Sequence, residues 1–352
     1  MNVLERAVRA ADHVQQRSRV LGFAVAVQKK FGDDNGGGLV TNLAYSGFVS
    51  VFPLLLVLVT VLGIVAGHDS SFARSIERSV LSQFPIIGTD LQNNVHALHR
   101  ATVPGLVFGL AGLTWGATGL SQTGLYAMAQ VWNVPGVLRP GFLARVWRSF
   151  AFLALLGTGV SVAGLLSGYG LLGRHTVLAG AASELASVIA TSALYLAGLR
   201  VLTTREVPWR LLVPGSVVGG IAWTALEAAG GELVARGLRH ESAVYGLFAI
   251  VLGLLAWIYL GARISMYAAE INAVLAFHLW PRSIAPPPLT SADRRALRLV
   301  AQQSERRPGE RVSVSFADAP ATPDGDAAPR DEGAALRQWR AAGLDHGTEG
   351  EK

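Results

Sequence analysis

Residues 39–67 read LVTNLAYSGFVSVFPLLLVLVTVLGIVAG, a run that contains no Asp, Glu, Lys or Arg. A helix needs about 20 apolar residues to cross a bilayer, so this run is long enough to span one. It also lacks the alternation of apolar and polar residues that marks the strands of a membrane barrel. The sequence therefore predicts a transmembrane helix over residues 39–66.

Five further segments have the same character. Residues 101–138 and 149–173 are free of charged side chains, and three later segments contain only one or two each. We therefore expect an all-α fold: a polytopic membrane helix bundle with six transmembrane helices, in a membrane domain over residues 39–280. The predicted spans are about 39–66, 103–127, 149–172, 178–202, 211–234 and 243–277.

The composition of the whole chain agrees with this class of protein. Of its 352 residues, 51% are hydrophobic and 15% are charged, whereas soluble domains carry about 25% charged residues. The mean hydropathy is +0.39, which excludes a disordered chain and disfavours an ordinary soluble enzyme. The chain has no cysteine, which excludes disulfides and thiolate metal sites. We expect no metal, no cofactor and no enzymatic activity.

Lys and Arg are distributed unevenly between the predicted loops. Of the 30, 23 fall in the N-terminal segment, the loops after the second and fourth spans and the C-terminal tail, and six fall in the opposite loops. Cytoplasmic loops carry the excess of Lys and Arg, so both termini are predicted to face the cytoplasm, in a multi-pass protein of the cell (plasma or inner) membrane. The net charge of +6 then indicates orientation and attraction to anionic inner-leaflet lipids, and no nucleic acid is expected as a partner.

Two segments flank the predicted membrane domain. Residues 1–38 begin with apolar residues at helical spacing and interleaved arginines, which favours an amphipathic helix on the inner leaflet or, alternatively, a short soluble helix. Residues 281–352 open on Pro-rich sequence, and 22 of these 72 residues are charged. We expect a disordered cytoplasmic tail, with one short helix from Ser291 to Gln303 and Ser291 as its N-cap.

The first two predicted spans contain residues that affect helix packing. Glycines at 105, 109, 112, 116 and 119 recur every three or four residues, which predicts a packing seam or, alternatively, a sliding surface for a gating helix. Pro53 removes one backbone hydrogen bond and predicts a kink in the first span, either as a packing feature or as a hinge. The candidate hinge or first-span motif comprises Asn42, Tyr45, Ser50 and Pro53.

Charged residues inside predicted spans are the strongest functional signal. Such charges are costly in a bilayer and usually face a bundle interior or water, where they find a partner. Glu227 lies in the fifth span, while Arg263 and Glu270 lie seven residues apart in the sixth. Glu227 could pair with Arg263, and Asn272 adds a polar group beside Glu270. The four residues form a candidate polar seam, which is either a pathway through the bundle or a structural ion pair.

Several short motifs, in order over residues 39–276, resemble those of the YihY/BrkB family of bacterial inner-membrane proteins. They are Leu43-Ala44-Tyr45 with Ser50 and Pro53-Leu54-Leu55, Trp223 to Glu227, Tyr245-Gly246, and Ala269-Glu270-Ile271-Asn272-Ala273. The family pattern often has a lysine soon after the glutamate of the fifth span. Here Ala228 to Gly231 follow Glu227, so a role that needs this cation would fall to Arg263.

The resemblance implies an integral membrane protein whose biochemical role is unsettled. The family formerly carried a ribonuclease BN label, and one branch is linked to serum resistance in a pathogen. The residues favour a transporter or permease for a small solute or lipid, which would use the polar seam. The alternative is a non-transporting scaffold for envelope organisation. A ribonuclease is the least favoured function, because the tail has equal numbers of acidic and basic residues and so no net attraction for phosphate.

Overall fold

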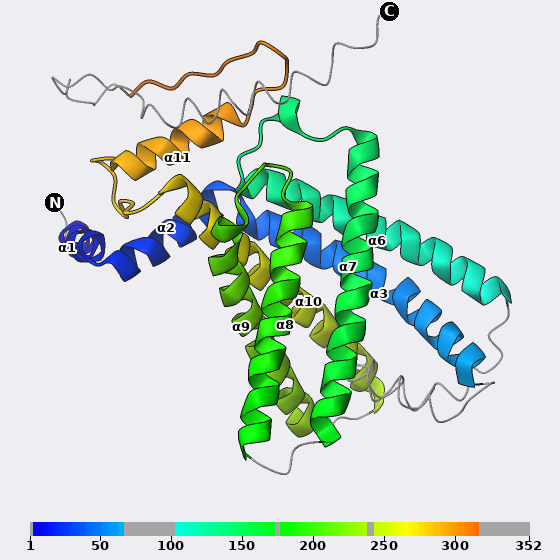
Figure 1. The fold of residues 1–352 in the computed structure, drawn as a ribbon. Helices are drawn as coiled ribbons and strands as arrows, with labels where there is room; N and C mark the ends of the chain where they lie inside the picture. Colours follow the sequence, from blue (N-terminus) through cyan, green and yellow to red (C-terminus); the bar gives the residue numbers. More distant parts are fainter. Residues whose placement is uncertain (1–2, 67–102, 173–176, 238–242, 317–352) are drawn as a thin grey trace, which may run out of the picture.

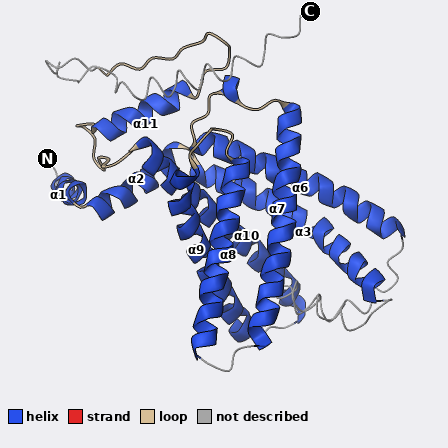
Figure 2. Ribbon diagram, viewed as in Figure 1, coloured by secondary structure: helices blue, strands red, loops and turns tan. Residues whose placement is uncertain are grey.

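The computed structural model describes residues 3–66, 103–172, 177–237 and 243–316, and every regular element in these ranges is helical (Figures 1 and 2). The helices, in chain order, are α1 (Val3–Arg17), α2 (Arg19–Asp33), α3 (Gly36–Ala66), α6 (Val103–Val131), the short 3-10 helix η2 (Gly136–Leu138), α7 (Phe142–Leu172), α8 (Val177–Leu202), α9 (Trp209–Gly237), α10 (Ala243–Phe277) and α11 (Ser291–Gln302). The all-α prediction is confirmed over the described residues.

The long helices pack as neighbours in a bundle. The most extensive packing is between α3 and α6, between α8 and α9 and between α9 and α10, and α10 also packs on α3. Figure 1 shows α7, α8 and α9 running side by side, with the α3–α6 pair extending away from them. Helix α10 therefore connects the two parts of the bundle.

Three helices are long and apolar enough to cross a membrane over described residues: Ala182–Leu202, Trp209–Gly230 and Val251–Phe277. Apolar side chains on their outer faces, such as Ile189, Ile221 and Leu252, are exposed. Exposed apolar faces on long apolar helices suit a lipid bilayer rather than water. The chain thus has the helices of a multi-pass membrane protein. Helices α3, α6 and α7 cover the three remaining predicted spans.

The α3–α6 contact explains two glycines of the predicted stripe, while Gly105 and Gly109 lie outside the residues whose side-chain surroundings the structure describes. A Cβ atom added at Gly112 would lie 3.1 Å from Cβ of Pro53, and one at Gly116 would lie 3.1 Å from Cα of Ser50. Gly119, in contrast, has no atom within 4 Å of such a Cβ. The two glycines let α6 approach α3 closely, which is the packing role expected of small residues in membrane helices.

The N-terminal segment contains two helices. Ser18 has an extended backbone and its side chain accepts a hydrogen bond from the backbone N–H of Leu21, so it ends α1 and caps α2. Helix α2 then packs on α10, and it buries Ala26 and Val27. The amphipathic helix expected near the N-terminus corresponds to α1, whereas α2 joins the bundle.

The short helix expected in the tail is confirmed as α11 (Ser291–Gln302), whereas the disorder expected around it is wrong for residues 281–290 and 303–316, which the structure describes. Helix α11 is capped by Thr290 rather than Ser291, because the Thr290 hydroxyl accepts from the backbone N–H of Asp293 and the Asp293 side chain accepts in return. Asp293 of α11 pairs with Lys29 of α2 at 3.3 Å and with Arg282 at 2.9 Å, contacts that local composition does not reveal. We call α1 together with residues 281–316 the terminal cap. Residues 317–352 lie outside the described part of the chain.

The terminal cap is held by a carboxylate on α1. Asp12 accepts hydrogen bonds from the Ser283 hydroxyl at 2.8 Å and from the backbone N–H of Ile284 at 2.9 Å, and Gln15 also donates to it at 2.8 Å. Burial by itself raises the pKa of Asp12, but these donated bonds outweigh it and hold the pKa well below the usual range. The ionised form of Asp12 is therefore part of the folded cap.

Candidate functional site

Three ionisable side chains meet where α2 ends against α10 and the last turn of α6. Lys30 lies on α2, Asp34 follows it by one helical turn, and Glu270 lies on α10. Their side chains are 1%, 1% and 0% exposed. We call these three residues the charge cluster.

Lys30 is the centre of the charge cluster. Its Nζ donates to the carboxylate of Asp34 and, at 2.9 Å, to the backbone carbonyl of Val131. The distance from Nζ to Oε2 of Glu270 is 3.8 Å, which is an ion pair without a hydrogen bond. One lysine therefore faces two buried carboxyl groups.

Three carboxyl oxygens in the charge cluster have no hydrogen-bond partner among the described residues. They are Oδ1 of Asp34 and both Oε1 and Oε2 of Glu270, all fully buried. Burial raises the pKa of Asp34 above its usual range, although the Lys30 ammonium acts to lower it. Buried polar atoms are almost always bonded in folded proteins, so the unbonded oxygens mark this site as more than a packing contact.

The structure places Asn272 in a different contact from Glu270. Its side-chain Oδ1 accepts from the backbone N–H of Gly215 at 2.7 Å, and its Nδ2 donates to the carbonyl of Leu212 at 3.0 Å. Pro214 lies between these two residues of α9 and cannot donate a backbone hydrogen bond. Asn272 thus stabilises an irregular turn of α9. Glu270 and Asn272 are two residues apart on α10, so their side chains point in directions about 200° apart. This separates Asn272 from the charge cluster.

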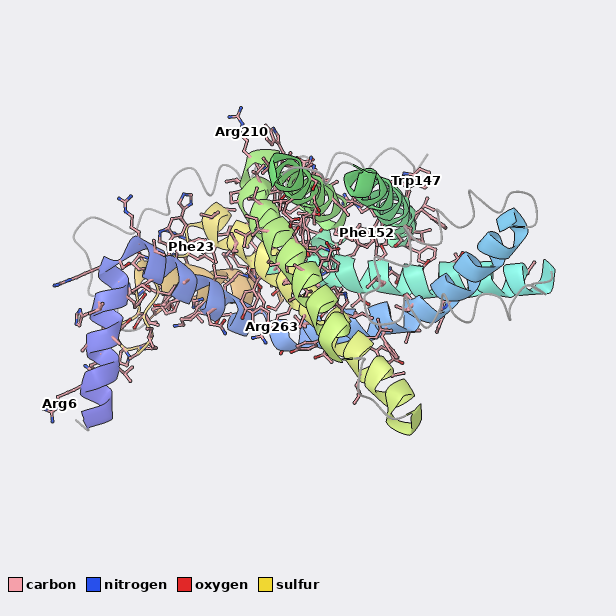
Figure 3. The ribbon with its side chains drawn as sticks, turned by 90° about the horizontal axis from the view of Figure 1, so that it is seen from below. Arg6, Phe23, Trp147, Phe152, Arg210 and Arg263 are labelled. Carbon is pink, nitrogen blue, oxygen red and sulfur yellow. The ribbon has the colours of Figure 1, made fainter. Side chains whose placement is uncertain are left out.

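The predicted ion pair between Glu227 and Arg263 is not formed. Glu227 accepts instead from the indole N–H of Trp223, one turn earlier on α9, at 2.7 Å. Arg263 is exposed and its guanidinium lies over the ring of Tyr267, at 5.8 Å from the centroid. Figure 3 shows Arg263 away from the side of the bundle where Arg210 is labelled.

The packing of α2 on α10 explains why Arg263 is exposed and Glu270 is buried, although their spacing puts them on one face of α10. The ring of Phe31 stacks on Tyr267, with centroids 4.5 Å apart. Helix α2 and its following turn therefore cover α10 from Tyr267 onward, which buries Glu270, while Arg263 lies one turn outside this cover. The structure does not bring the four residues of the predicted polar seam together.

The first-span motif divides into exposed and buried residues. Asn42 and Tyr45 are exposed, whereas Ser50 is buried and its hydroxyl donates to the carbonyl of Ser46 at 2.7 Å. Ser50 and Pro53 face α6 at the glycine contacts described above. A hinge at Pro53 stays a prediction.

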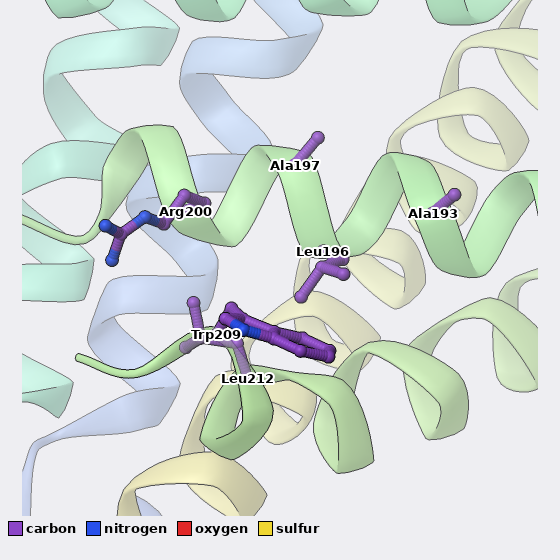
Figure 4. Close-up of a pocket in the computed structure, with 6 residues that line it drawn as sticks. All are labelled: Ala193, Leu196, Ala197, Arg200, Trp209 and Leu212. Atoms are coloured by element: carbon purple, nitrogen blue, oxygen red, sulfur yellow. The ribbon is translucent and has the colours of Figure 1, made fainter.

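A pocket of about 350 Å³ lies between α8 and α9. Its lining is apolar except for Arg200, and comprises Ala193, Leu196, Ala197, Trp209 and Leu212. Figure 4 shows Leu196 of α8 pointing toward Trp209 and Leu212, with Arg200 at one end. The Trp209 side chain is exposed. We call this the α8–α9 pocket.

Arg200 is the charged residue that lines this pocket, and Arg148, which does not line it, carries a guanidinium group near enough to feel its charge. Arg200 donates to the carbonyl of Val207 at 2.8 Å, and Arg148 donates to the carbonyls of Val201 and Thr203, each at 3.0 Å. Burial and the neighbouring charge of Arg200 lower the pKa of Arg148, which precedes the predicted third span. Neither arginine forms an ion pair with a carboxylate among the described residues. The pocket therefore has one arginine, Arg200, in its lining, and a second, Arg148, near it.

The long apolar helices and the buried charges define a helical integral membrane protein. A comparison with protein families matches residues 27–285 to the family described as virulence factor BrkB. The chain belongs to this family, as its motifs indicated. Comparisons with curated proteins and with solved structures gave no significant match.

Sequence reasoning missed Lys30 and Asp34, which lie before the predicted membrane domain. Lys29 and Lys30 count only among the positive charges that predict the orientation of the chain in the membrane. A signal was nevertheless present, since Lys30 shares a helical stripe with the apolar residues Ala26 and Val27, and Asp34 continues that stripe. The family match also begins at residue 27, so it includes all three members of the charge cluster.

Proposed function

We propose that this chain is a six-span protein of the cell membrane, with both termini in the cytoplasm, and that it binds and moves an anionic lipid across the bilayer. Membership of the BrkB family and the positions of α3, α6 and α7 support the six spans. The distribution of Lys and Arg supports the orientation. The small solute or lipid expected from the sequence is thereby narrowed to an amphiphile with a negatively charged headgroup.

The α8–α9 pocket carries this proposal. Its apolar walls suit an acyl chain, because lipid-binding surfaces are lined mostly by apolar groups with a few polar groups that fix orientation. Arg200 lines the pocket and forms no ion pair with a described carboxylate, and Arg148 lies near it; guanidinium binds phosphate oxygens in a bidentate manner. The exposed Trp209 suits the membrane interface, where tryptophan is enriched.

Lipid movement can be tested with the full-length protein in liposomes that contain a fluorescent phosphatidylglycerol. A membrane-impermeant quencher added outside reports how fast labelled lipid crosses from the inner leaflet. We expect faster crossing than in empty liposomes, and a loss of at least fivefold in the variants Arg200→Gln and Ala193→Trp. The first removes a headgroup contact and the second fills the pocket.

Arg263→Gln is the matched control, because it removes an exposed arginine of α10 outside the pocket. It should leave the rate within twofold of the unsubstituted protein. Equal rates for a labelled zwitterionic lipid and for phosphatidylglycerol would argue against recognition of the anionic headgroup. No acceleration by the unsubstituted protein would refute lipid transport altogether.

The scaffold alternative is supported by the terminal cap, which offers an ordered surface at the ends of the chain. Removal of residues 317–352 leaves all described contacts in place. A lipid transporter should keep its rate after this truncation. A scaffold that works through the tail would instead lose the envelope phenotype of the intact gene while the truncated protein remains folded in the membrane.

A further inference from the structure

The charge cluster contains an odd number of ionisable groups. Fully ionised, Lys30 contributes one positive charge, and Asp34 and Glu270 contribute two negative charges, so the cluster would hold one net negative charge. All three side chains are at most 1% exposed. An uncompensated charge at such depth is costly, and buried groups usually avoid that cost by changing their protonation state.

No other group near the cluster, among the residues that the structure describes, removes the excess negative charge. Asp33, at the end of α2, adds a further negative charge nearby, but it is paired with Arg282 of the terminal cap, with Nη1 2.5 Å from Oδ2. On the α6 side the polar neighbour is the carbonyl of Val131, which lies on Lys30. Arg205 is directed at the carbonyl of Trp132 at 3.3 Å and at the ring of Phe277.

The unbonded oxygens give a second, independent reason for a missing ligand. Asp34 has one buried oxygen without a partner and Glu270 has two, while the described donors around them are used elsewhere. The smallest ligand that corrects both the charge and the missing donor is a proton. It would come from solvent and bind one carboxylate oxygen, which leaves one ammonium, one carboxylate and one neutral carboxylic acid that can donate a hydrogen bond.

We infer that Lys30, Asp34 and Glu270 form a binding site for a single proton, held between the two carboxyl groups at neutral pH at the junction of α2, α6 and α10. This site is separate from the α8–α9 pocket and does not depend on lipid transport. Because the proton belongs to the pair, replacement of either carboxyl group by an amide makes it unnecessary: the remaining carboxylate is balanced by Lys30.

Infrared difference spectroscopy of the purified protein tests this inference, since a protonated carboxylic acid has a C=O stretch that a carboxylate lacks. The spectrum of the unsubstituted protein at pH 7 should contain this band, and Glu270→Gln and Asp34→Asn should each remove it. Glu184→Gln, which changes an exposed carboxylate of α8, should leave it unchanged. A band that survives Asp34→Asn would show a protonated Glu270 with no shared site and would overturn the inference, as would the absence of any band assigned to the cluster.

A series of unfolding measurements at different pH values gives a second test. It needs only the unsubstituted protein and Glu270→Gln to fold, and not Asp34→Asn. A proton bound only in the folded state stabilises the folded state at low pH. This contribution is lost as the pH rises through the folded-state pKa of the carboxyl pair. Between the unfolded pKa of the carboxyl groups and the folded-state pKa of the pair, the unfolding equilibrium of the unsubstituted protein should change about tenfold per pH unit relative to that of Glu270→Gln. Stabilisation by NaCl that is abolished in Glu270→Gln, with no such pH difference, would identify a metal-cation site and overturn the proton site.

Discussion

The substitution Lys30→Met removes the ammonium group that holds the charge cluster together while it keeps a side chain of similar length. Asp34 loses its hydrogen bond and ion pair, the Val131 carbonyl loses its donor at 2.9 Å, and Glu270 loses the cation 3.8 Å away. Removal of one partner from a buried ion pair costs about 3–5 kcal/mol, because a charge remains buried without compensation. We expect a loss of this size in the free energy of unfolding at pH 7.5.

The loss should become smaller as the pH falls. Without Lys30, both carboxyl groups can be neutralised only by protons, and the raised pKa of Asp34 in the intact protein would rise further once the lowering effect of the lysine is gone. A carboxyl group whose pKa is raised on folding destabilises the folded state when it is ionised. At a pH below that pKa the group is neutral, and this cost is removed. The variant should therefore regain stability at pH 5 relative to the unsubstituted protein.

Unfolding by sodium dodecyl sulfate in mixed micelles, followed by tryptophan fluorescence, measures both effects. Lys29→Met is the matched control, because it removes the adjacent lysine, whose side chain is 29% exposed and which pairs with Asp293 at 3.3 Å. A partly exposed pair is worth about 1 kcal/mol or less. Equal losses from the two substitutions, or a loss below about 1 kcal/mol for Lys30→Met, would refute the central role of Lys30.

Two further predictions concern the α9–α10 contact and the terminal cap. Gly215→Ala should destabilise the protein by at least about 1–3 kcal/mol, because the added Cβ would meet the carbonyl oxygen of Ala268 at 1.9 Å; Gly119→Ala, with no atom within 4 Å, should have no such cost, and equal unfolding curves for the two variants would contradict this. Asp12→Asn should release residues 281–316 to limited proteolysis. Because the pKa of Asp12 is lowered on folding, its contribution is complete above its unfolded value of about 4 and is lost only at lower pH, so a cap that detaches between pH 7 and pH 5 would contradict the assignment.

The sequence predicted the helical class and the family because both depend on local pattern. Uncharged runs of more than 20 residues are visible without any tertiary information, and so are Pro53 and Gly112, which faces it. The same reasoning found the short helix α11 but failed for the rest of residues 281–316, for which it predicted disorder. Their charge content is typical of disorder, but Asp293 and Arg282 are neutralised by each other and by α2, which only the folded chain reveals.

The charge cluster was only partly predictable from the sequence, because the packing of α2 over α10 decides which charges are buried. Glu270 was correctly singled out as a buried charge, and it is 0% exposed. Its partner Lys30 is 240 residues away in the sequence, and no spacing rule relates the two positions. Arg263 shares the helical face of Glu270 but not its surroundings, since the cover supplied by Phe31 and α2 begins at Tyr267. Periodicity identifies a face, whereas the residues that cover it decide which charges meet.

Helix α2 links the terminal cap to the charge cluster through the period of an α-helix. Lys29 and Asp33, one turn apart, bond to the cap, where the Lys29 ammonium reaches the carbonyl of Ser283 at 2.6 Å and Asp33 pairs with Arg282. Lys30 and Asp34, each one residue later and rotated by about 100°, face the bundle interior. A shift of α2 away from α10 would break both sets of contacts together. The ordered cap and the buried cluster are therefore two sides of one helix, which explains why a segment with the composition of a disordered tail folds onto a membrane protein.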